Sequence, residues 1–170
     1  FPATFFVMSK KNCEHYATKV TVPLIESEGS SNAVNEFNFL LQRDQELEKQ
    51  SLQVDLLRKL VSKGVGMHHA GLNPLLKEII EILYSKGYLQ VLFATGTFTV
   101  GLNMPIRTVV LTGLDVYSEQ HQRIVPFSSD EFIQMCGRAG RRGLDKRGYV
   151  VVSLLRNVVP PSLHELKNMM

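Results

Sequence analysis

A polar segment near the end of the chain carries one glutamine and two arginines at helical spacing. Read as a helix, QMCGRAGRRGLDKRG (residues 134–148) places Gln134, Arg138 and Arg141 at i, i+4 and i+7, on one side. The apolar residues of the segment fall on the other side, which predicts that this other side packs. Guanidinium groups are planar and always charged, so a row of them suits a polyanion, and phosphate above all. The alternative for such a run is an ordinary solvated basic face.

Two glycines flank the arginines in the same predicted helix and favour a ligand. Gly137 and Gly140 lie in its interior, where a glycine costs about 1 kcal/mol relative to alanine. Because glycine has no side chain, another group can approach the backbone closely. We therefore expect this face to bind a phosphate-bearing ligand.

A second Gly- and Thr-rich segment, ATGTFTVGLNMP (residues 94–105), follows a predicted strand. Gly96 and Gly101 have the spacing of the two glycines of a P-loop, but Leu102 and Asn103 stand where that loop requires Lys and Ser or Thr. The sequence has no other P-loop and no acidic pair placed to hold Mg²⁺. We therefore expect that this chain alone neither binds nor hydrolyses a nucleoside triphosphate. The alternative for the segment is a tight turn that needs glycine.

Apolar and amphipathic stretches alternate along the chain and predict the elements that position these residues. Buried strands are predicted at 2–8, 65–67, 91–94, 108–112 and 149–155. Helices are predicted after Ser9, over 46–63, over 74–86 with an Asn73 cap, and from a capping box at Ser128. Residues 26–32 are predicted to form a loop and 114–127 a polar excursion. This alternation predicts an α/β fold with a parallel sheet.

Ligands collect at the carboxyl ends of parallel strands, and polar residues follow three of the predicted strands. These residues are Ser9 and Lys10, the segment from His68 to Gly71, and Thr95. For the two histidines the alternative is one buried and one exposed imidazole without a ligand. Neither HExxH spacing nor a cysteine partner favours zinc, so we expect no metal site.

The composition fits one globular domain: 44% of the 170 residues are hydrophobic, 21% are charged, and the formal charge is +3. The modest charge predicts that binding of a polyanion by this chain alone is weak and salt-sensitive. No apolar run approaches the roughly 18 residues of a membrane span, and no leader pattern opens the chain, so we expect neither a membrane nor a secreted protein. Two isolated cysteines predict a reduced, intracellular setting. Phe1 in place of a methionine suggests a piece of a longer polypeptide.

Three motifs, QMCGRAGRRGLDKRG, ATGTFTVGLNMP and GVGMHHAGL, occur in an order and spacing that resemble the second RecA-like domain of superfamily-2 helicases. The resemblance is in particular to the Ski-like DExH-box RNA helicases that serve the RNA exosome. The opening FFVMSKKNCE resembles the first strand of that domain and its motif IV. The resemblance implies a RecA-like three-layer α/β/α domain with a mostly parallel central sheet over residues 1–155, and a C-terminal extension or linker over 156–170.

The resemblance also implies roles for individual residues. Arg138 and Arg141 would be arginine fingers acting on the γ-phosphate of ATP, with Gln134 beside them near the attacking water. The positions that approach the nucleotide would be Gly101, Asn103 and Gly137. The RNA backbone would be contacted by Ser9, Lys10, His69, Gly71 and Thr95. Gly96 departs from the family pattern. A β-hairpin is expected within 114–127, and the alternative for this segment is an ordinary surface loop.

As a whole, the resemblance implies the C-terminal motor lobe of an ATP-dependent RNA helicase, inactive alone. ATP and Mg²⁺ would be used by the full-length enzyme, with the Mg²⁺ ligands on a first lobe that this chain lacks. The implied partners are RNA, the N-terminal RecA-like domain of the same protein, the exosome and adaptor proteins, but no membrane. The implied location is the nucleus or the cytoplasm.

Two other functions stay open from the sequence. One is a non-catalytic RecA-like module that binds RNA or protein. The other is a lobe of a DNA-repair helicase, because the motifs of such enzymes are similar.

Overall fold

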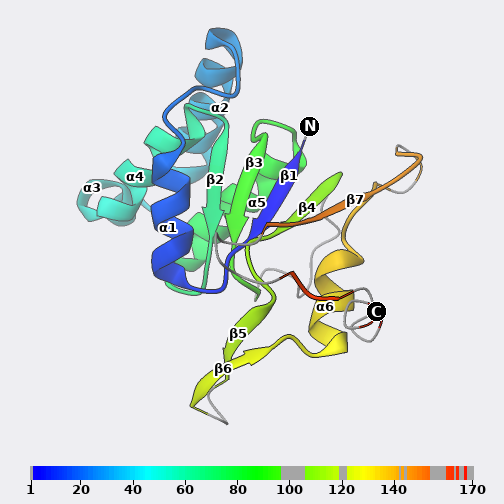
Figure 1. The fold of residues 1–170 in the computed structure, drawn as a ribbon. Helices are drawn as coiled ribbons and strands as arrows, with labels where there is room; N and C mark the ends of the chain where they lie inside the picture. The colour runs from blue at the N-terminus through cyan, green and yellow to red at the C-terminus, as the bar shows by residue number, and fades with distance from the viewer. Residues whose placement is uncertain are drawn as a thin grey trace.

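A parallel sheet of five strands forms the centre of the molecule (Figure 1). This computed structural model describes residues 2–96, 106–118, 122–141, 143, 145–153, 160–162, 164 and 167. The sheet order is β2-β3-β1-β4-β7, with strands at Ala3–Phe6 (β1), Val65–His68 (β2), Val91–Ala94 (β3), Thr108–Leu111 (β4) and Tyr149–Val152 (β7). All of its pairings are parallel, as the sequence predicts.

Helices cover both faces of this sheet. Their bounds are Lys10–Lys19 (α1), Ser27–Leu41 (α2), Gln45–Gln50 (α3), Leu52–Val61 (α4), Pro74–Ser85 (α5) and Ser129–Cys136 (α6). Figure 1 shows α1 in front of the sheet and α5 behind it. The chain is therefore a three-layer α/β/α domain of the RecA-like class, as the resemblance implies.

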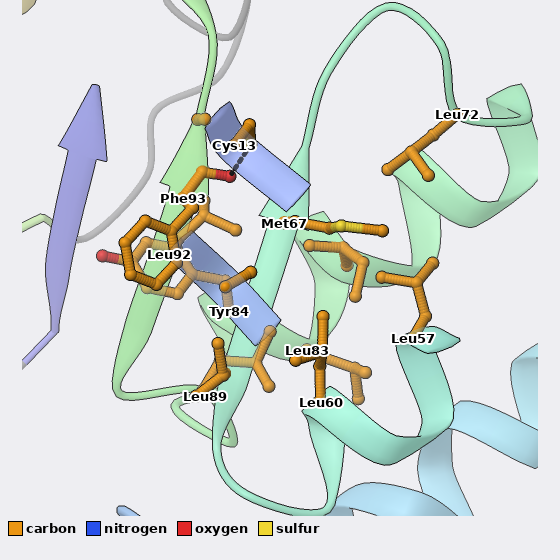
Figure 2. Packing of buried hydrophobic residues seen from close by; sticks show 14 of the residues in the cluster. Cys13, Leu57, Leu60, Met67, Leu72, Leu83, Tyr84, Leu89, Leu92 and Phe93 are labelled. Carbon is orange, nitrogen blue, oxygen red and sulfur yellow. Dashed lines mark hydrogen bonds between the residues drawn. The ribbon is translucent and has the colours of Figure 1, made fainter. Parts of the chain in front are cut away.

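The core is built where the helices meet β2 and β3. Figure 2 shows Leu57 and Leu60 of α4 beside Met67 and Leu83 in this cluster. Two of the polar contacts in and beside this cluster are internal: the hydroxyls of Thr4 and Tyr84 are 3.0 Å apart, and the Cys13 thiol donates to the Phe93 carbonyl at 3.2 Å. Burial raises the pKa of Cys13 to about 12, so this thiol stays protonated and unreactive.

The predicted helix starts are confirmed. The Ser9 hydroxyl accepts a hydrogen bond from the Asn12 N–H and caps α1, and the Asn73 side chain caps α5 ahead of Pro74. Ser128 and Glu131 form the predicted capping box of α6. The expected hairpin is present as well, with β5 at Asp115–Ser118 antiparallel to β6 at Arg123–Pro126.

The predicted loop at 26–32 is wrong, because α2 begins at Ser27. Ala33, Phe37 and Leu41 follow one another at four-residue spacing and are fully buried. The polar Ser and Gly residues that suggested a loop form the first turns of this helix. Their helix propensity is weak, but the packing of the buried residues further along the helix outweighs it.

Two further predictions need correction. The helix predicted over 46–63 is divided at Ser51, whose extended backbone (φ −105°, ψ 113°) separates α3 from α4. The strand predicted at 149–155 was expected to be buried on both faces, but Tyr149, Val150 and Val151 of β7 are 42–50% exposed. Within the described residues β7 pairs with β4 alone, so it is an edge strand.

Candidate functional site

The residues predicted to contact an RNA backbone all lie at one edge of the sheet, where its strands end. Ser9 and Lys10 follow β1, His69 and Gly71 follow β2, and Thr95 follows β3. These three strands are neighbours, and their last residues are in register, so the five residues lie beyond adjacent carboxyl ends. Such an edge is where α/β sheets bind ligands.

Lys10 lies beside the loop after β2. A Cβ atom added to Gly71 would lie 3.5 Å from Cδ of Lys10, so the two segments meet although 61 positions separate them in the sequence. Ser9, Lys10 and Gly71 are all exposed. A cationic side chain, a hydroxyl and a residue without a side chain therefore share one accessible surface, which suits a sugar–phosphate backbone.

His69 supports this surface from below. It is 1% exposed, and its Nδ1 accepts a hydrogen bond from the Gly71 N–H at 3.1 Å. The proton is therefore on Nε2, which lies 3.2 Å from a carboxylate oxygen of Glu14. Burial is the main cause of the lowered pKa of His69, and the nearby Lys10 charge lowers that pKa further. Its imidazole shapes the loop and is too deeply buried to contact RNA from the surface.

His68 is also buried, at 6% exposure. Its Nε2 lies 2.7 Å from the Glu81 carboxylate, while burial lowers its pKa. The alternative of one buried and one exposed imidazole is therefore wrong.

Gln53 joins α4 to the same loop and was not singled out from the sequence. Its amide nitrogen donates to the Gly71 carbonyl at 2.9 Å, and its amide oxygen accepts from the Asn73 N–H at 3.1 Å. One side chain thus satisfies two backbone groups that flank Leu72. The sequence carries no signal for this contact, because Gln53 is 18 residues from Gly71 and belongs to no motif.

The Gly- and Thr-rich segment is described only in part. Thr95 is half-buried and its N–H donates to the His68 carbonyl at 3.1 Å. Gly101 and Asn103 lie outside the described residues.

The arginine segment is a turn after a helix, which corrects the sequence prediction. Helix α6 ends at Cys136, and Gly137 is its C-terminal cap. Arg138 and Arg141 therefore do not continue the helical stripe of Gln134, and Gly137 and Gly140 are not inside a helix. Further along the turn, Gly140 has a φ of +91°, which L side chains rarely adopt.

The backbone that approaches these glycines is the chain's own. A Cβ on Gly148 would lie 2.4 Å from the carbonyl carbon of Ala139, and one on Gly140 would lie 3.1 Å from Cα of Gly148. The Gly140 N–H donates to the Ile106 carbonyl at 2.9 Å. Gly140 and Gly148 let the arginine turn pass close to the start of β7, so these two glycines do not by themselves indicate a ligand.

Arg141 is paired with Asp145 within this turn. Its Nε and Nη2 donate to the two carboxylate oxygens at 2.7 and 2.8 Å. The Arg141 guanidinium, aided by Arg107 at 3.9 Å, lowers the pKa of Asp145 to about 2. The Arg–Asp spacing of i, i+4 in the sequence was the available signal for this pair, and it was missed. Of the other proposed nucleotide residues, Gln134 is exposed on α6 and Arg138 is half-buried in the turn.

Comparison with known proteins identifies the domain. Residues 5–143 match the family described as the helicase conserved C-terminal domain. The chain belongs to this family. Mouse exosome RNA helicase MTR4 is 42% identical over 160 residues, which cover 94% of this chain and 15% of that protein. ATP-dependent RNA helicase mtr4 of Schizosaccharomyces pombe is 41% identical over 94% of the chain and 14% of its own length. Antiviral helicase SKI2 of Saccharomyces cerevisiae is 40% identical over 89% and 12%.

This helicase C-terminal domain therefore spans only about one seventh of the relatives it matches. The family match runs from β1 into the arginine turn, so it includes GVGMHHAGL, ATGTFTVGLNMP and residues 134–143 of the third motif, but not its last five residues. Among the described residues, no helix has the length and apolar character to cross a bilayer. The same part of the chain holds no cluster of three His, Cys, Asp or Glu residues that could bind a metal.

Proposed function

We propose that this chain is the C-terminal motor lobe of an ATP-dependent RNA helicase that acts in exosome-linked RNA processing or decay. A first RecA-like lobe of the same protein would bind ATP and supply the Mg²⁺ ligands. This lobe would contribute Arg138 and Arg141 as fingers, with Gln134 near the attacking water and Gly101, Asn103 and Gly137 along the nucleotide. The lobe alone would be inactive.

RNA would be held across the carboxyl ends of β2, β3 and β1. The observation that carries this part is the meeting of Lys10 with Gly71 beside the cap residue Ser9. These groups offer a positive charge and a hydroxyl but no reader of base identity, which favours binding of the backbone irrespective of sequence. With Thr95 and the backbone at His69 they would follow one strand across the domain. The relatives' names, exosome RNA helicase and ATP-dependent RNA helicase, favour RNA over DNA.

The decisive measurement is RNA-stimulated ATPase of the full-length protein carrying Arg141→Ala. An arginine finger contributes about 10³ to 10⁵ in rate, so turnover should fall to near background. Arg43→Ala is the matched control, because Arg43 also donates two hydrogen bonds to one carboxylate, that of Glu78, but on the distant α2–α3 side. The control should keep full activity.

The outcome separates the candidate functions. Near-normal turnover of Arg141→Ala would remove the finger assignment. A full-length protein that binds RNA without any ATPase would be the non-catalytic module. Stimulation by DNA rather than RNA would favour the DNA-repair lobe.

A further inference from the structure

The loop from Arg141 to Asp145 is closed by both its main chain and its side chains. The Asp145 N–H donates to the Arg141 carbonyl at 2.9 Å, and the Arg141 N–H donates to Oδ2 of Asp145 at 3.1 Å. The guanidinium adds its bonds from Nε and Nη2 at 2.7 and 2.8 Å. One carboxylate thus fixes both the backbone and the side chain of a single arginine.

The two partners differ in their access to solvent. The Asp145 side chain is 6% exposed and the Arg141 side chain 28% exposed. Arg107 Nε, at the start of β4, lies 3.9 Å from Asp145 Oδ1 and adds a second positive charge on the carboxylate. The carboxylate is therefore held in the protein, and the guanidinium lies between it and solvent.

This pairing leaves part of the guanidinium unused. An arginine side chain has five N–H donors, and the contacts with Asp145 use one on Nε and one on Nη2. The remaining three, including both on Nη1, donate to no described residue. They form the fork that binds a phosphate oxygen pair or a single developing charge.

We propose that Asp145 is a positioning residue, which holds Arg141 by its inner edge so that its outer N–H groups face the γ-phosphate during hydrolysis. This inference rests on the proposed function. An arginine side chain loses rotamer entropy when it is fixed, and a prepositioned guanidinium does not lose that entropy again when the nucleotide binds. The pair is thus compatible with a finger, because Arg141 keeps its inner contacts while its outer edge acts.

The test compares Asp145→Asn, Arg141→Ala and the double variant in RNA-stimulated ATPase of the full-length protein. Asparagine keeps the size of the side chain but loses the second acceptor and the charge. We expect kcat to fall about 10- to 100-fold with less than twofold change in the KM for ATP, as for a displaced catalytic group. The double variant should be no slower than Arg141→Ala, because Asp145 acts only through Arg141.

Arg141→Lys is the second variant, useful if Asp145→Asn folds poorly. Lysine keeps the positive charge but has no planar fork that could bind the carboxylate with one edge and a phosphate with the other, so its turnover should match that of Arg141→Ala. Glu78→Gln is the control, since it removes the carboxylate partner of an exposed arginine elsewhere. It should leave kcat unchanged.

Each other result overturns the inference. Full activity of Asp145→Asn would make the pair a structural contact only. Faster turnover would mean that Asp145 competes with the nucleotide for Arg141. Full activity of Arg141→Lys would show that charge suffices without orientation. Normal turnover of Arg141→Ala would instead refute the finger on which the inference rests, so the two failures are distinguishable.

Discussion

Gly148 sets how closely the arginine turn approaches β7. Its missing side chain leaves room for the Ala139 carbonyl, which would lie 2.4 Å from a Cβ atom, far inside van der Waals contact. The Ala139 carbonyl and the Gly148 Cα that would carry this Cβ are both backbone atoms, so the clash cannot be relieved by rotating a side chain. Gly148→Ala should therefore displace the turn and reduce the free energy of unfolding by about 1–3 kcal/mol, the usual cost of overpacking.

Gly113→Ala is the matched control for this prediction. A Cβ there meets nothing within 4 Å and its φ is not positive, so the unfolding free energy should change by less than about 0.5 kcal/mol. Urea unfolding of the chain measures both. Equal stability of the two variants would contradict the backbone crossing.

Gln53 operates between elements, because it connects α4 with the loop that precedes α5. Its two hydrogen bonds hold the carbonyl of Gly71 and the N–H of Asn73. Gln53→Ala should free this loop from α4 and raise the RNA concentration for half-maximal ATPase of the full-length protein about 5- to 10-fold, equivalent to roughly 1 kcal/mol for a lost hydrogen bond. The kcat at saturating RNA should not change.

Gln53→Glu separates the contribution of the hydrogen bond to Gly71 from that of the hydrogen bond to Asn73. Glutamate can still accept from the Asn73 N–H but places a second oxygen against the Gly71 carbonyl. In this variant the RNA concentration for half-maximal ATPase should therefore rise at least as much as in Gln53→Ala. Gln42→Ala, an exposed glutamine at the end of α2, is the control. Unchanged RNA dependence in both Gln53 variants would remove any role of this loop in binding.

The extent of prediction from sequence also differs among the elements. The strands β1 to β4 and the capped starts of α1, α5 and α6 were predicted, because each depends on a local apolar run or on a cap within three residues. The end of α6 at Cys136 was not, and neither was the close approach of Gly140 to Gly148 in the turn that follows it. Strand β7 shows the same limit: its sequence is that of a buried strand, and only its place at the sheet edge exposes it.

The site follows the same division. The alternation of strands and helices was enough to predict that Ser9, His69 and Thr95 follow strands of a parallel sheet, whereas the structure alone shows that these strands are neighbours. Which side chains face outward was not predictable. His69 lies beside Glu14 of α1, a charge that only the fold brings near. The Arg141–Asp145 pair is local, at i, i+4, and its spacing was a signal in the sequence that was missed.

For the whole molecule, the two buried histidines make stability depend on pH. Burial lowers the pKa of both below the usual 6.5, despite the carboxylates of Glu81 and Glu14, while Lys77 and Lys10 act in the same direction as burial. At pH 7 and above their contribution is fully present, since native and unfolded imidazoles are both neutral. Below pH 6.5 the unfolded chain binds protons that the native chain does not, so the free energy of unfolding falls as the pH falls.

Urea unfolding of the chain at pH 7, 6 and 5 measures this dependence. The slope should approach, per buried histidine, about 1.4 kcal/mol for each pH unit at most. His69→Asn keeps an acceptor for the Gly71 N–H and should reduce the slope, whereas His15→Asn, at an exposed position, should not. The Arg141–Asp145 pair does not interfere, because a pKa near 2 means that its contribution is complete above about pH 4 and is lost only as the pH falls towards 2. Equal slopes for the chain and His69→Asn would mean that His69 does not resist protonation in the native state.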